Sequence, residues 1–317
     1  ADRPLTFGPD EIGRLKEIVL SGSGIQREGG GYTYVEDFGE RYSTDLIGEH
    51  RLKNPLKVVA ACGNGTAGLF APKVLRAIGC EVVELDCELD YTFPNYNPNP
   101  EDMKMLHAVA DAVKAHGAAV GLAFDGDGDR CGVVDNTGEE IFADKVGVLL
   151  AREISARHPG SNFVVDVKST GLFATDPVLL ENGVTVDYWK TGHSYIKRRV
   201  NELGARAGFE KSGHFFFNAP VGRGYDDGLI AAIAVCEMLD HNAGTPLSAL
   251  RASLPQTWQS PTLSPHCAAA VKYGVLDRAS AHFPALAYAA TPTARHPHRA
   301  AAPRRTARHP PPAVGRA

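Results

Sequence analysis

Long apolar runs, paired-cysteine motifs and a strong excess of one charge are all missing from this sequence. The longest apolar stretch, residues 229–239, is too short to cross a bilayer, and no apolar signal core stands near residue 1. The six cysteines include no Cys-x-x-Cys pair and follow no small secreted framework, which favours reduced, buried thiols. The formal net charge of −4 indicates no nucleic-acid partner. We therefore expect a cytoplasmic protein without a membrane or nucleic-acid partner.

The composition is that of an ordinary globular α/β protein, with 44% hydrophobic and 22% charged residues. The 317 residues have room for about two domains. Charge is unevenly distributed, because residues 279–317 contain six arginines, no lysine and no acid. The body of the chain is therefore acidic and its last segment basic.

An acidic loop lies between two short apolar runs within residues 120–134. Three aspartates alternate with glycines and an arginine follows them: Asp125-Gly126-Asp127-Gly128-Asp129-Arg130. Glycine adopts positive φ at little cost, so the loop can fold tightly enough for the three carboxylates to converge on one cation. Hard oxygen ligands suit Mg2+, which keeps coordination positions for water or a phosphate oxygen. The pattern predicts a magnesium site, with the arginine placed to hold a phosphate.

The acidic loop has two other interpretations. A calcium-binding EF-hand needs Gly at its sixth position and Glu at its twelfth, where this loop has Arg130 and Asn136. That excludes a calcium hand. An exposed acidic turn is the plain structural alternative. We favour the metal site because the preceding apolar strand would be buried, and α/β sheets place their ligands at the carboxyl ends of such strands.

Apolar periodicity predicts alternating strands and helices in two successive α/β units, residues 42–139 and 140–255. Strands are expected at residues 56–61, 81–85, 163–167 and 184–189 and before the acidic loop, with a possible strand at 32–35. Helices are expected at residues 9–20, 71–78, 101–116, 144–154, 174–181, 195–203, 229–239 and 246–254. The helix and possible strand within residues 1–40 cannot form a core by themselves.

Three polar clusters follow strands in the second unit. They are Asp166-Val167-Lys168-Ser169-Thr170, Lys190-Thr191-Gly192-His193-Ser194 and Gly208-Phe209-Glu210-Lys211-Ser212-Gly213-His214. A parallel sheet would present all three at one edge. In an extended segment, Glu210, Ser212 and His214 would point the same way and suit sugar hydroxyls. Lys168 and His193 are weaker candidates, because a single lysine is usually a solvated charge and a single histidine beside glycine is usually part of a turn.

Two further motifs have competing interpretations. Gly63-Asn64-Gly65-Thr66-Ala67-Gly68 matches the dinucleotide-binding fingerprint, and acids follow about twenty residues later. A structural strand-to-helix turn is the favoured alternative, because any tight turn of this kind favours glycines. Asp226-Asp227-Gly228 precedes an apolar helix, and we expect its acids to cap that helix.

Together, these motifs resemble the α-D-phosphohexomutase family, in particular its phosphomannomutase/phosphoglucomutase branch. The resemblance is carried by Asp125-Gly-Asp-Gly-Asp-Arg130, Gly208-Phe-Glu-Lys-Ser-Gly-His214, Lys190-Thr-Gly-His193, Asp166-Val-Lys168 and Cys62-Gly-Asn-Gly65, in that family's spacing. It implies tandem α/β/α domains with mixed sheets, of which residues 41–139 and 140–254 would be the second and third. Residues 1–40 would be a remnant of the first domain and 255–278 the start of the fourth, both domains being largely missing.

The resemblance implies a reaction that moves a phosphoryl group between O1 and O6 of mannose and glucose phosphates. It would proceed through a phosphoserine and a bisphosphorylated sugar, with Mg2+ and hexose 1,6-bisphosphate as activator. The implied roles are Asp125, Asp127 and Asp129 as metal ligands, Arg130 beside the phosphoserine, Lys168 and His193 as acid and base or sugar-positioning groups, and Gly192, Glu210, Ser212 and His214 as sugar contacts.

The sequence departs from this family in two ways. It contains no Ser-His-Asn-Pro, so the serine that would carry the phosphate is absent. After residue 278 it becomes rich in Ala, Pro, Arg and His, which we interpret as a frameshift in a truncated mutase, although a natural disordered tail fits equally well. Other hypotheses are a haloacid-dehalogenase-like phosphatase with Asp125 as nucleophile and Asp127 as acid/base, and a non-catalytic sugar-phosphate or dinucleotide binder. The oligomeric state and the preferred sugar stay open.

Overall fold

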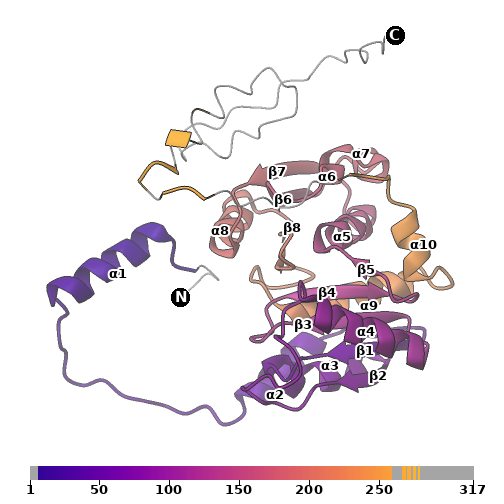
Figure 1. Ribbon diagram of the computed structural model, residues 1–317, viewed down its shortest axis with the longest axis horizontal. Helices are drawn as coiled ribbons and strands as arrows, with labels where there is room; N and C mark the ends of the chain where they lie inside the picture. The colour runs from indigo at the N-terminus through magenta and orange to yellow at the C-terminus, as the bar shows by residue number, and fades with distance from the viewer. Residues whose placement is uncertain (1–5, 259–265, 269, 273, 276–277, 279–317) are drawn as a thin grey trace. The chain divides into compact units, whose positions relative to one another are not determined.

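The computed structural model describes residues 6–258, 266–268, 270–272, 274–275 and 278 (Figure 1). The contacts within the chain divide it into two units, residues 1–257 and 258–317, and every named helix and strand lies in the first. The predicted start of a fourth domain at 255–278 lies partly outside the described residues, and the segment 279–317 lies wholly outside them.

The first sheet contains five strands in the order β2-β1-β3-β4-β5 (Figure 1). Their bounds are β1 Leu56–Ala61, β2 Cys80–Leu85, β3 Val120–Phe124, β4 Cys131–Asp135 and β5 Glu140–Ile141. Strands β2, β1 and β3 are parallel, whereas β4 and β5 are antiparallel to their neighbours. All five residues of β3 are buried, as expected for a strand covered on both faces. The sheet is therefore mixed, as the family resemblance implied.

Helices cover both faces of this sheet. They are α2 Phe38–Ile47, the short 3-10 helix η1 Thr66–Leu69, α3 Ala71–Ile78 and α4 Met103–His116. Helix α4 begins where the Asp102 carboxylate accepts the Lys104 N–H, and it ends at Gly117, whose φ of 59° is left-handed. Its buried face packs against β1, β3 and β4, in a cluster that includes Val109 and Val113.

The second sheet contains four strands in the order β7-β6-β8-β9, with only β9 antiparallel. The strands are β6 Asn162–Asp166, β7 Thr185–Trp189, β8 Ala207–Phe209 and β9 Phe215–Phe217. The helices around them are α5 Ala143–Arg157, α6 Leu172–Thr175, α7 Pro177–Glu181 and α8 His193–Leu203. Residues 174–181, expected to form one helix, instead belong to α6 and α7, because Asp176 ends the first and its side chain caps the second.

Helix α9 (Gly228–His241) packs against strands of both sheets, and α10 (Leu247–Ala252) follows it in the chain. Most α9 side chains are buried, and the helix contacts α5, β4 and β9. One continuous apolar cluster therefore contains residues of both sheets and of α9. Burying one large apolar side chain, such as Val, Leu, Ile, Phe or Met, typically stabilises a fold by about 1.5–3 kcal/mol. In residues 38–254, the two α/β units thus share one core.

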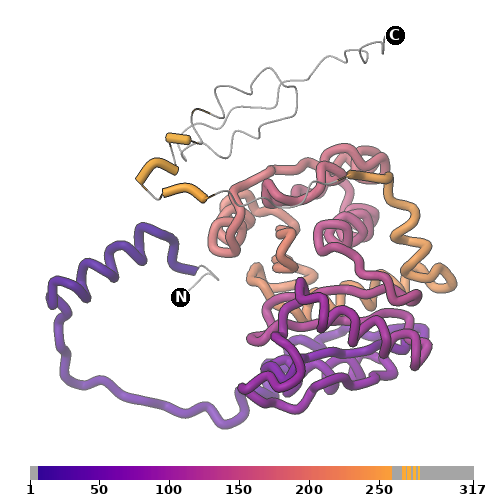
Figure 2. The backbone as a smooth tube through the Cα atoms, in the orientation of Figure 1, coloured from indigo at the N-terminus to yellow at the C-terminus, as the bar shows by residue number. Residues whose placement is uncertain are grey.

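The N-terminal segment differs from the sequence prediction in two places. Helix α1 (Pro9–Ser21) forms as expected, but residues 32–35 are not a strand, and Tyr32 and Tyr34 are 88% and 70% exposed. The chain from α1 to α2 has no regular secondary structure until Phe38 (Figure 2). Helix α2 was not predicted, because it buries only Ser43 and Leu46 and so lacks a clear apolar periodicity. It also crosses the boundary proposed between residues 40 and 41.

Candidate active site

The acidic loop connects the antiparallel strands β3 and β4. Phe124 pairs with Cys131, so the loop begins directly at the carboxyl end of the buried strand β3, as predicted. Gly128 has a φ of 80°, which permits the tight turn, whereas Gly126 has no left-handed φ. Only one of the two glycines therefore uses the conformational freedom expected of both.

Asp125 is the anchor of this loop and is only 3% exposed. Its Oδ1 accepts the backbone N–H groups of Gly128 and Arg130, each at 3.1 Å, and its Oδ2 accepts Arg130 Nε at 2.7 Å. Arg130 Nη1 also donates to Asn99 Oδ1 at 3.1 Å. Both Asp125 oxygens are thus already bonded and the group is buried. This geometry gives no support to Asp125 as the nucleophile of a phosphatase.

The three aspartates converge as predicted. One oxygen each of Asp125, Asp127 and Asp129 lies within 4.8 Å of the others. Burial raises the pKa of Asp129 to about 7, and the neighbouring carboxylates add to this effect while His214 opposes it. A divalent cation would neutralise this repulsion, and three carboxylates leave room for water or phosphate in an octahedral shell. The donor set therefore fits Mg2+.

The candidate sugar loop, residues 210–214, is the turn of the hairpin between β8 and β9. The Glu210 N–H donates to the His214 carbonyl at 3.0 Å, and the Gly213 N–H donates to the Glu210 carbonyl at 3.1 Å. The argument from alternate positions of an extended strand is therefore wrong, because the segment reverses direction. The structure nevertheless groups these residues, with Ser212 partly exposed at the turn.

The Glu210 side chain is hydrogen-bonded to the second polar cluster, residues 190–194. Its Oε1 accepts the backbone N–H of Gly192 at 2.6 Å, and the residue is 1% exposed. Burial raises the pKa of Glu210 to about 7, although the Gly192 hydrogen bond opposes this shift. The carboxyl group can therefore hold or release a proton near neutral pH.

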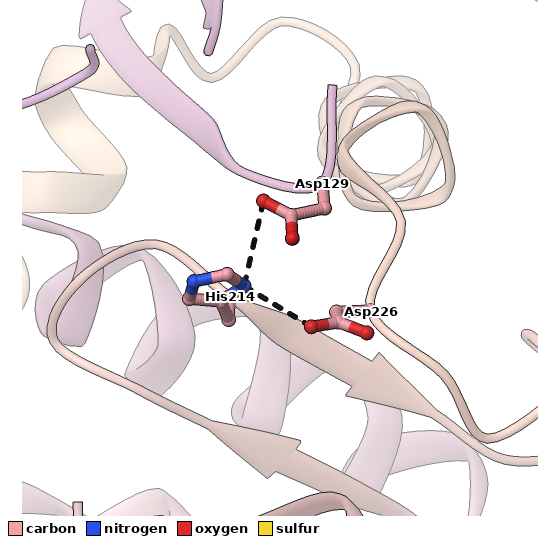
Figure 3. Close-up of side chains that lie close together, drawn as sticks. All are labelled: Asp129, His214 and Asp226. Atoms are coloured by element: carbon pink, nitrogen blue, oxygen red, sulfur yellow. Dashed lines mark ion pairs between the residues drawn. The ribbon is translucent and has the colours of Figure 1, made fainter. Parts of the chain in front are cut away.

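His214 stands between two carboxylates (Figure 3). Its Nδ1 lies 3.2 Å from Asp226 Oδ2 and 3.6 Å from Asp129 Oδ1. Burial would lower the pKa of His214, but these carboxylates outweigh it and raise the pKa. His193, the first residue of α8, stacks on His214 with ring centroids 5.6 Å apart, and burial lowers its pKa. The two neighbouring imidazoles therefore differ in proton affinity.

Asp226 links several of these groups. Besides His214, it forms an ion pair with Lys197 Nζ at 2.5 Å, and His193 Nδ1 lies 3.6 Å from its Oδ2. Burial would raise the pKa of Asp226, but His214 and Lys197 outweigh it and bring the pKa to about 2. Asp226 is thus an ionised, almost buried carboxylate at the centre of the cluster.

The three polar clusters meet at one buried carboxylate, Asp166, at the end of β6. Its oxygens accept Ser169 Oγ, Thr191 Oγ1 at 3.1 Å and the Lys211 N–H at 3.4 Å. These three donors come from the three separate clusters. The prediction that a parallel sheet gathers them at one edge is confirmed.

Direct backbone contacts join the acidic loop to the sugar loop and to α9. The Cys131 N–H donates to the Gly213 carbonyl at 3.3 Å, and the Gly228 N–H donates to the Gly128 carbonyl at 3.0 Å. A Cβ on Gly228 would lie 2.7 Å from that same carbonyl oxygen. The two loops therefore form one continuous site.

Lys168, one of the predicted site residues, lies outside this network. It is exposed and forms no hydrogen bond or ion pair with any residue in the described part of the chain. It follows β6 by two residues, beside the Asp166 cluster.

Sequence reasoning missed Asp226 and Lys197. Asp227 caps α9 as predicted, since its Oδ1 accepts the N–H groups of Leu229 and Ile230. One acid is sufficient for this cap, so Asp226 is available for other contacts. The presence of two adjacent acids where one is enough was the feature of the sequence that could have indicated a second role. Nothing in the sequence around Lys197 marks it as a partner, because it lies on α8, 29 positions before Asp226.

The glycine-rich turn after β1 contacts the protein's own backbone. A Cβ on Gly65 would lie 2.9 Å from the Gly126 carbonyl oxygen, and one on Gly68 only 2.1 Å from the Cys87 carbonyl oxygen. The absence of side chains thus permits close packing within the fold. This supports the structural turn rather than a dinucleotide site.

Comparison with known proteins places this fold and site in one class. The phosphoglucomutase/phosphomannomutase alpha/beta/alpha domain II matches residues 33–138, and domain III of the same family matches residues 142–258. A phosphomannomutase/phosphoglucomutase of Pseudomonas aeruginosa is 41% identical over 237 residues, covering 75% of this chain and 50% of the relative. A phosphoglucomutase of Neisseria meningitidis is 38% identical over 259 residues, covering 82% and 55%.

A solved structure of a phosphoglucomutase/phosphomannomutase family protein from Burkholderia thailandensis is similar, with a TM-score of 0.75 and 37% identity. The match covers 81% of this chain and 54% of that one. The chain therefore belongs to the phosphoglucomutase/phosphomannomutase family of phosphohexomutases and contains its domains II and III. It spans about half the length of the curated relatives it matches. No helix among the described residues is long and apolar enough to span a membrane.

Proposed function

We propose that this chain forms the metal- and sugar-binding part of a phosphomannomutase/phosphoglucomutase. The observation that carries the proposal is the junction of two loops: the converging carboxylates of Asp125, Asp127 and Asp129 adjoin the Glu210–His214 turn. The names of the relatives, which are phosphomannomutases/phosphoglucomutases and phosphoglucomutases, support mannose and glucose phosphates as the substrate class.

In this proposal Asp125, Asp127 and Asp129 hold Mg2+, which when bound would neutralise charge on phosphoryl oxygens. Arg130 is already oriented by Asp125 and Asn99 and would bind a phosphate beside the acidic loop. Because these two contacts already fix the guanidinium group, it would donate hydrogen bonds to the phosphate with only a small loss of side-chain conformational entropy.

The remaining residues would bind the sugar and hold its protons. The Glu210 carboxylate and the Ser212 hydroxyl suit sugar hydroxyls, and His214, with its raised pKa, would donate a hydrogen bond. Gly192 would keep the backbone close to Glu210. His193, with its lowered pKa, would be neutral and able to accept a proton, while exposed Lys168 would donate one or bind the sugar phosphate.

Turnover would require a serine that this sequence does not provide. It contains no Ser-His-Asn-Pro, and the chain corresponds to about half of its relatives. We therefore propose binding of Mg2+ and hexose phosphate for this chain, and the mutase reaction, with hexose 1,6-bisphosphate as activator, for this chain combined with the rest of the relatives' length.

We further propose the division of the chain at residues 41–139 and 140–254 as second and third domains. The two sheets support it, because strands β1 to β4 lie before this division and strands β6 to β9 lie after it. The exception is β5, Glu140–Ile141, which follows the division but pairs with β4 of the first sheet. A reducing, cytoplasmic environment is proposed from the six free cysteines.

The test is conversion of mannose 1-phosphate and glucose 1-phosphate to the 6-phosphates with Mg2+ and a trace of hexose 1,6-bisphosphate, with an EDTA control. Calorimetry with glucose 1-phosphate and with NAD is run in parallel. We expect Mg2+-dependent sugar-phosphate binding without turnover. Turnover abolished by EDTA would keep the metal assignment but show that the missing serine is dispensable. Phosphate release without isomerisation, or binding of NAD alone, would overturn the proposal.

A further inference from the structure

Two cysteines that the proposed function does not use lie side by side behind the acidic loop. Cys62 follows β1, Cys87 follows β2, and their sulfur atoms are 3.5 Å apart. The Cys62 N–H donates to the Leu85 carbonyl at 3.0 Å, so the backbone ladder of the two parallel strands continues to this point. The strand pairing ends at Ala61 and Leu85, one residue before Cys62 and two before Cys87, and the sulfur distance shows that the two side chains meet.

The two thiols have different environments. Cys62 is fully buried, whereas Cys87 is partly exposed, so a small oxidant would approach the pair from the side of Cys87. The hydrogen bond with Cys62 lowers the pKa of the Cys87 thiol, although burial opposes this shift. The thiolate is the reactive form of cysteine, so Cys87 is the more reactive member of the pair.

We propose that Cys62 and Cys87 form a reversible intramolecular disulfide when the protein meets hydrogen peroxide. The Cys87 thiolate attacks a peroxide oxygen, the O–O bond breaks, and water leaves after protonation, which gives a sulfenic acid. The Cys62 thiol then attacks that sulfur, loses its proton and releases a second water. Two thiols lose two electrons in total, and the peroxide is reduced to two waters.

The disulfide would act on the acidic loop through the turn that follows Cys62. The sulfur atoms must approach each other by about 1.5 Å to reach the bond length of about 2.05 Å. The Gly65 N–H is bonded to the Cys62 carbonyl at 2.8 Å, and Thr66 donates both its N–H and its Oγ1 to the Gly126 carbonyl. A Cβ on Gly65 would lie 2.9 Å from that oxygen, so the turn and the acidic loop are already in close contact and a shift of one would move the other. Oxidation would therefore displace Gly126 and weaken cation binding by the flanking aspartates.

The chain provides a matched control pair. Cys80 and Cys236 have sulfur atoms 3.9 Å apart, but they are only 7% and 0% exposed. The hydrogen bond with Cys80 and complete burial raise the pKa of Cys236 far above its usual value. The two sulfur atoms of this pair are close together but both cysteines are buried away from an oxidant in solution, and we expect the pair to stay reduced.

The experiment uses the full chain with Cys267→Ser, because exposed Cys267 would otherwise link chains together. The protein is treated with hydrogen peroxide, denatured, alkylated and digested with trypsin and a glutamate-specific protease. Cleavage after Glu81 and Glu84 separates Cys80 from Cys87. We expect a Cys62–Cys87 peptide, loss of two free thiols per chain, and full reversal by dithiothreitol.

Two variants of the proposed pair and one of the control pair make the assignment specific. Cys87→Ser should abolish the disulfide, and Cys62→Ala should leave a dimedone-reactive sulfenic acid on Cys87. Cys236→Ala should oxidise like the parent. Oxidation that instead joins Cys80 to Cys236, or that leaves Cys62 and Cys87 free in excess peroxide, would overturn the proposal.

Calorimetry then compares Mg2+ binding before and after oxidation. We expect oxidation to weaken binding at least about twofold in the parent and to have no effect in Cys87→Ser. Equal affinities in the oxidised and reduced parent would refute the coupling. If neither form binds Mg2+, the proposed function fails, whereas the peptide map still decides the disulfide.

Discussion

His214 Nδ1 and Asp226 Oδ2 lie 3.2 Å apart, although the residues are 12 positions apart in the sequence and Asp226 stands directly before the acid that caps α9. The same carboxylate holds Lys197, whose side chain is only 10% exposed. A buried cation and an imidazole therefore depend on one anion for their orientation.

Asp226→Asn should destabilise the protein by about 3 kcal/mol, because it leaves the Lys197 ammonium buried without a counter-charge. Urea unfolding at neutral pH measures this change. The double variant Asp226→Asn with Lys197→Met should regain most of the loss, since it removes the unpaired charge. A loss below about 0.5 kcal/mol in the single variant would show that Asp226 has no such role.

Mg2+ should bind the chain through the acidic loop and raise its thermal midpoint. Asp127→Asn removes one exposed carboxylate from the cluster, and we expect an affinity loss of at least about tenfold, or about 1.4 kcal/mol, by calorimetry. Asp111→Asn, an exposed aspartate on α4, is the matched control and should bind as the parent does. Equal losses in both variants would indicate nonspecific electrostatic attraction.

Glu210 should make stability depend on pH. Burial raises its folded pKa from 4.5 to about 7, so the folded state retains a proton that the unfolded state releases between these values. The contribution is fully present below about pH 4.5 and is lost as pH rises to about 7, by at most about 3 kcal/mol. Glu210→Gln should make this slope shallower in urea unfolding between pH 5 and pH 8, and Asp129, whose pKa is also raised to about 7, accounts for part of the slope that remains. Glu181→Gln, an exposed change on α7, should retain it, and an unchanged slope in Glu210→Gln would contradict the assignment.

Gly68→Ala should destabilise the protein by about 1–3 kcal/mol, because its new methyl group would lie 2.1 Å from the Cys87 carbonyl oxygen. Gly171→Ala is the control, since a Cβ there meets no atom within 4 Å and its φ of −65° suits alanine. Chemical unfolding of both variants compares them directly. If Gly68→Ala were neutral, the close packing of this turn would not hold the fold, and a ligand-binding role for its glycines would need to be reconsidered.

The element order and the acidic loop could be predicted because they depend on local patterns. Apolar runs of strand length, glycines at turns and alternating acids act within a few residues of one another. Helix α2 could not be predicted in this way, since its stability depends on contacts such as the Tyr42 ring with Phe70, 5.1 Å between centroids, across the chain. The supposed strand at residues 32–35 failed for the same reason, because β-branched and aromatic residues form a strand only where a partner strand exists.

The sequence by itself determined which residues are candidates for the site: residue type and spacing single out the three aspartates, Arg130, and the glutamate and histidine of the candidate sugar loop. Only the tertiary structure decided which of two adjacent acids caps α9 and which pairs with His214 and Lys197. It also decided that Asp166 ties three loops together and that Cys62 lies against Cys87. These relationships join residues far apart in the chain, and their strength depends on burial, which the folded core alone sets.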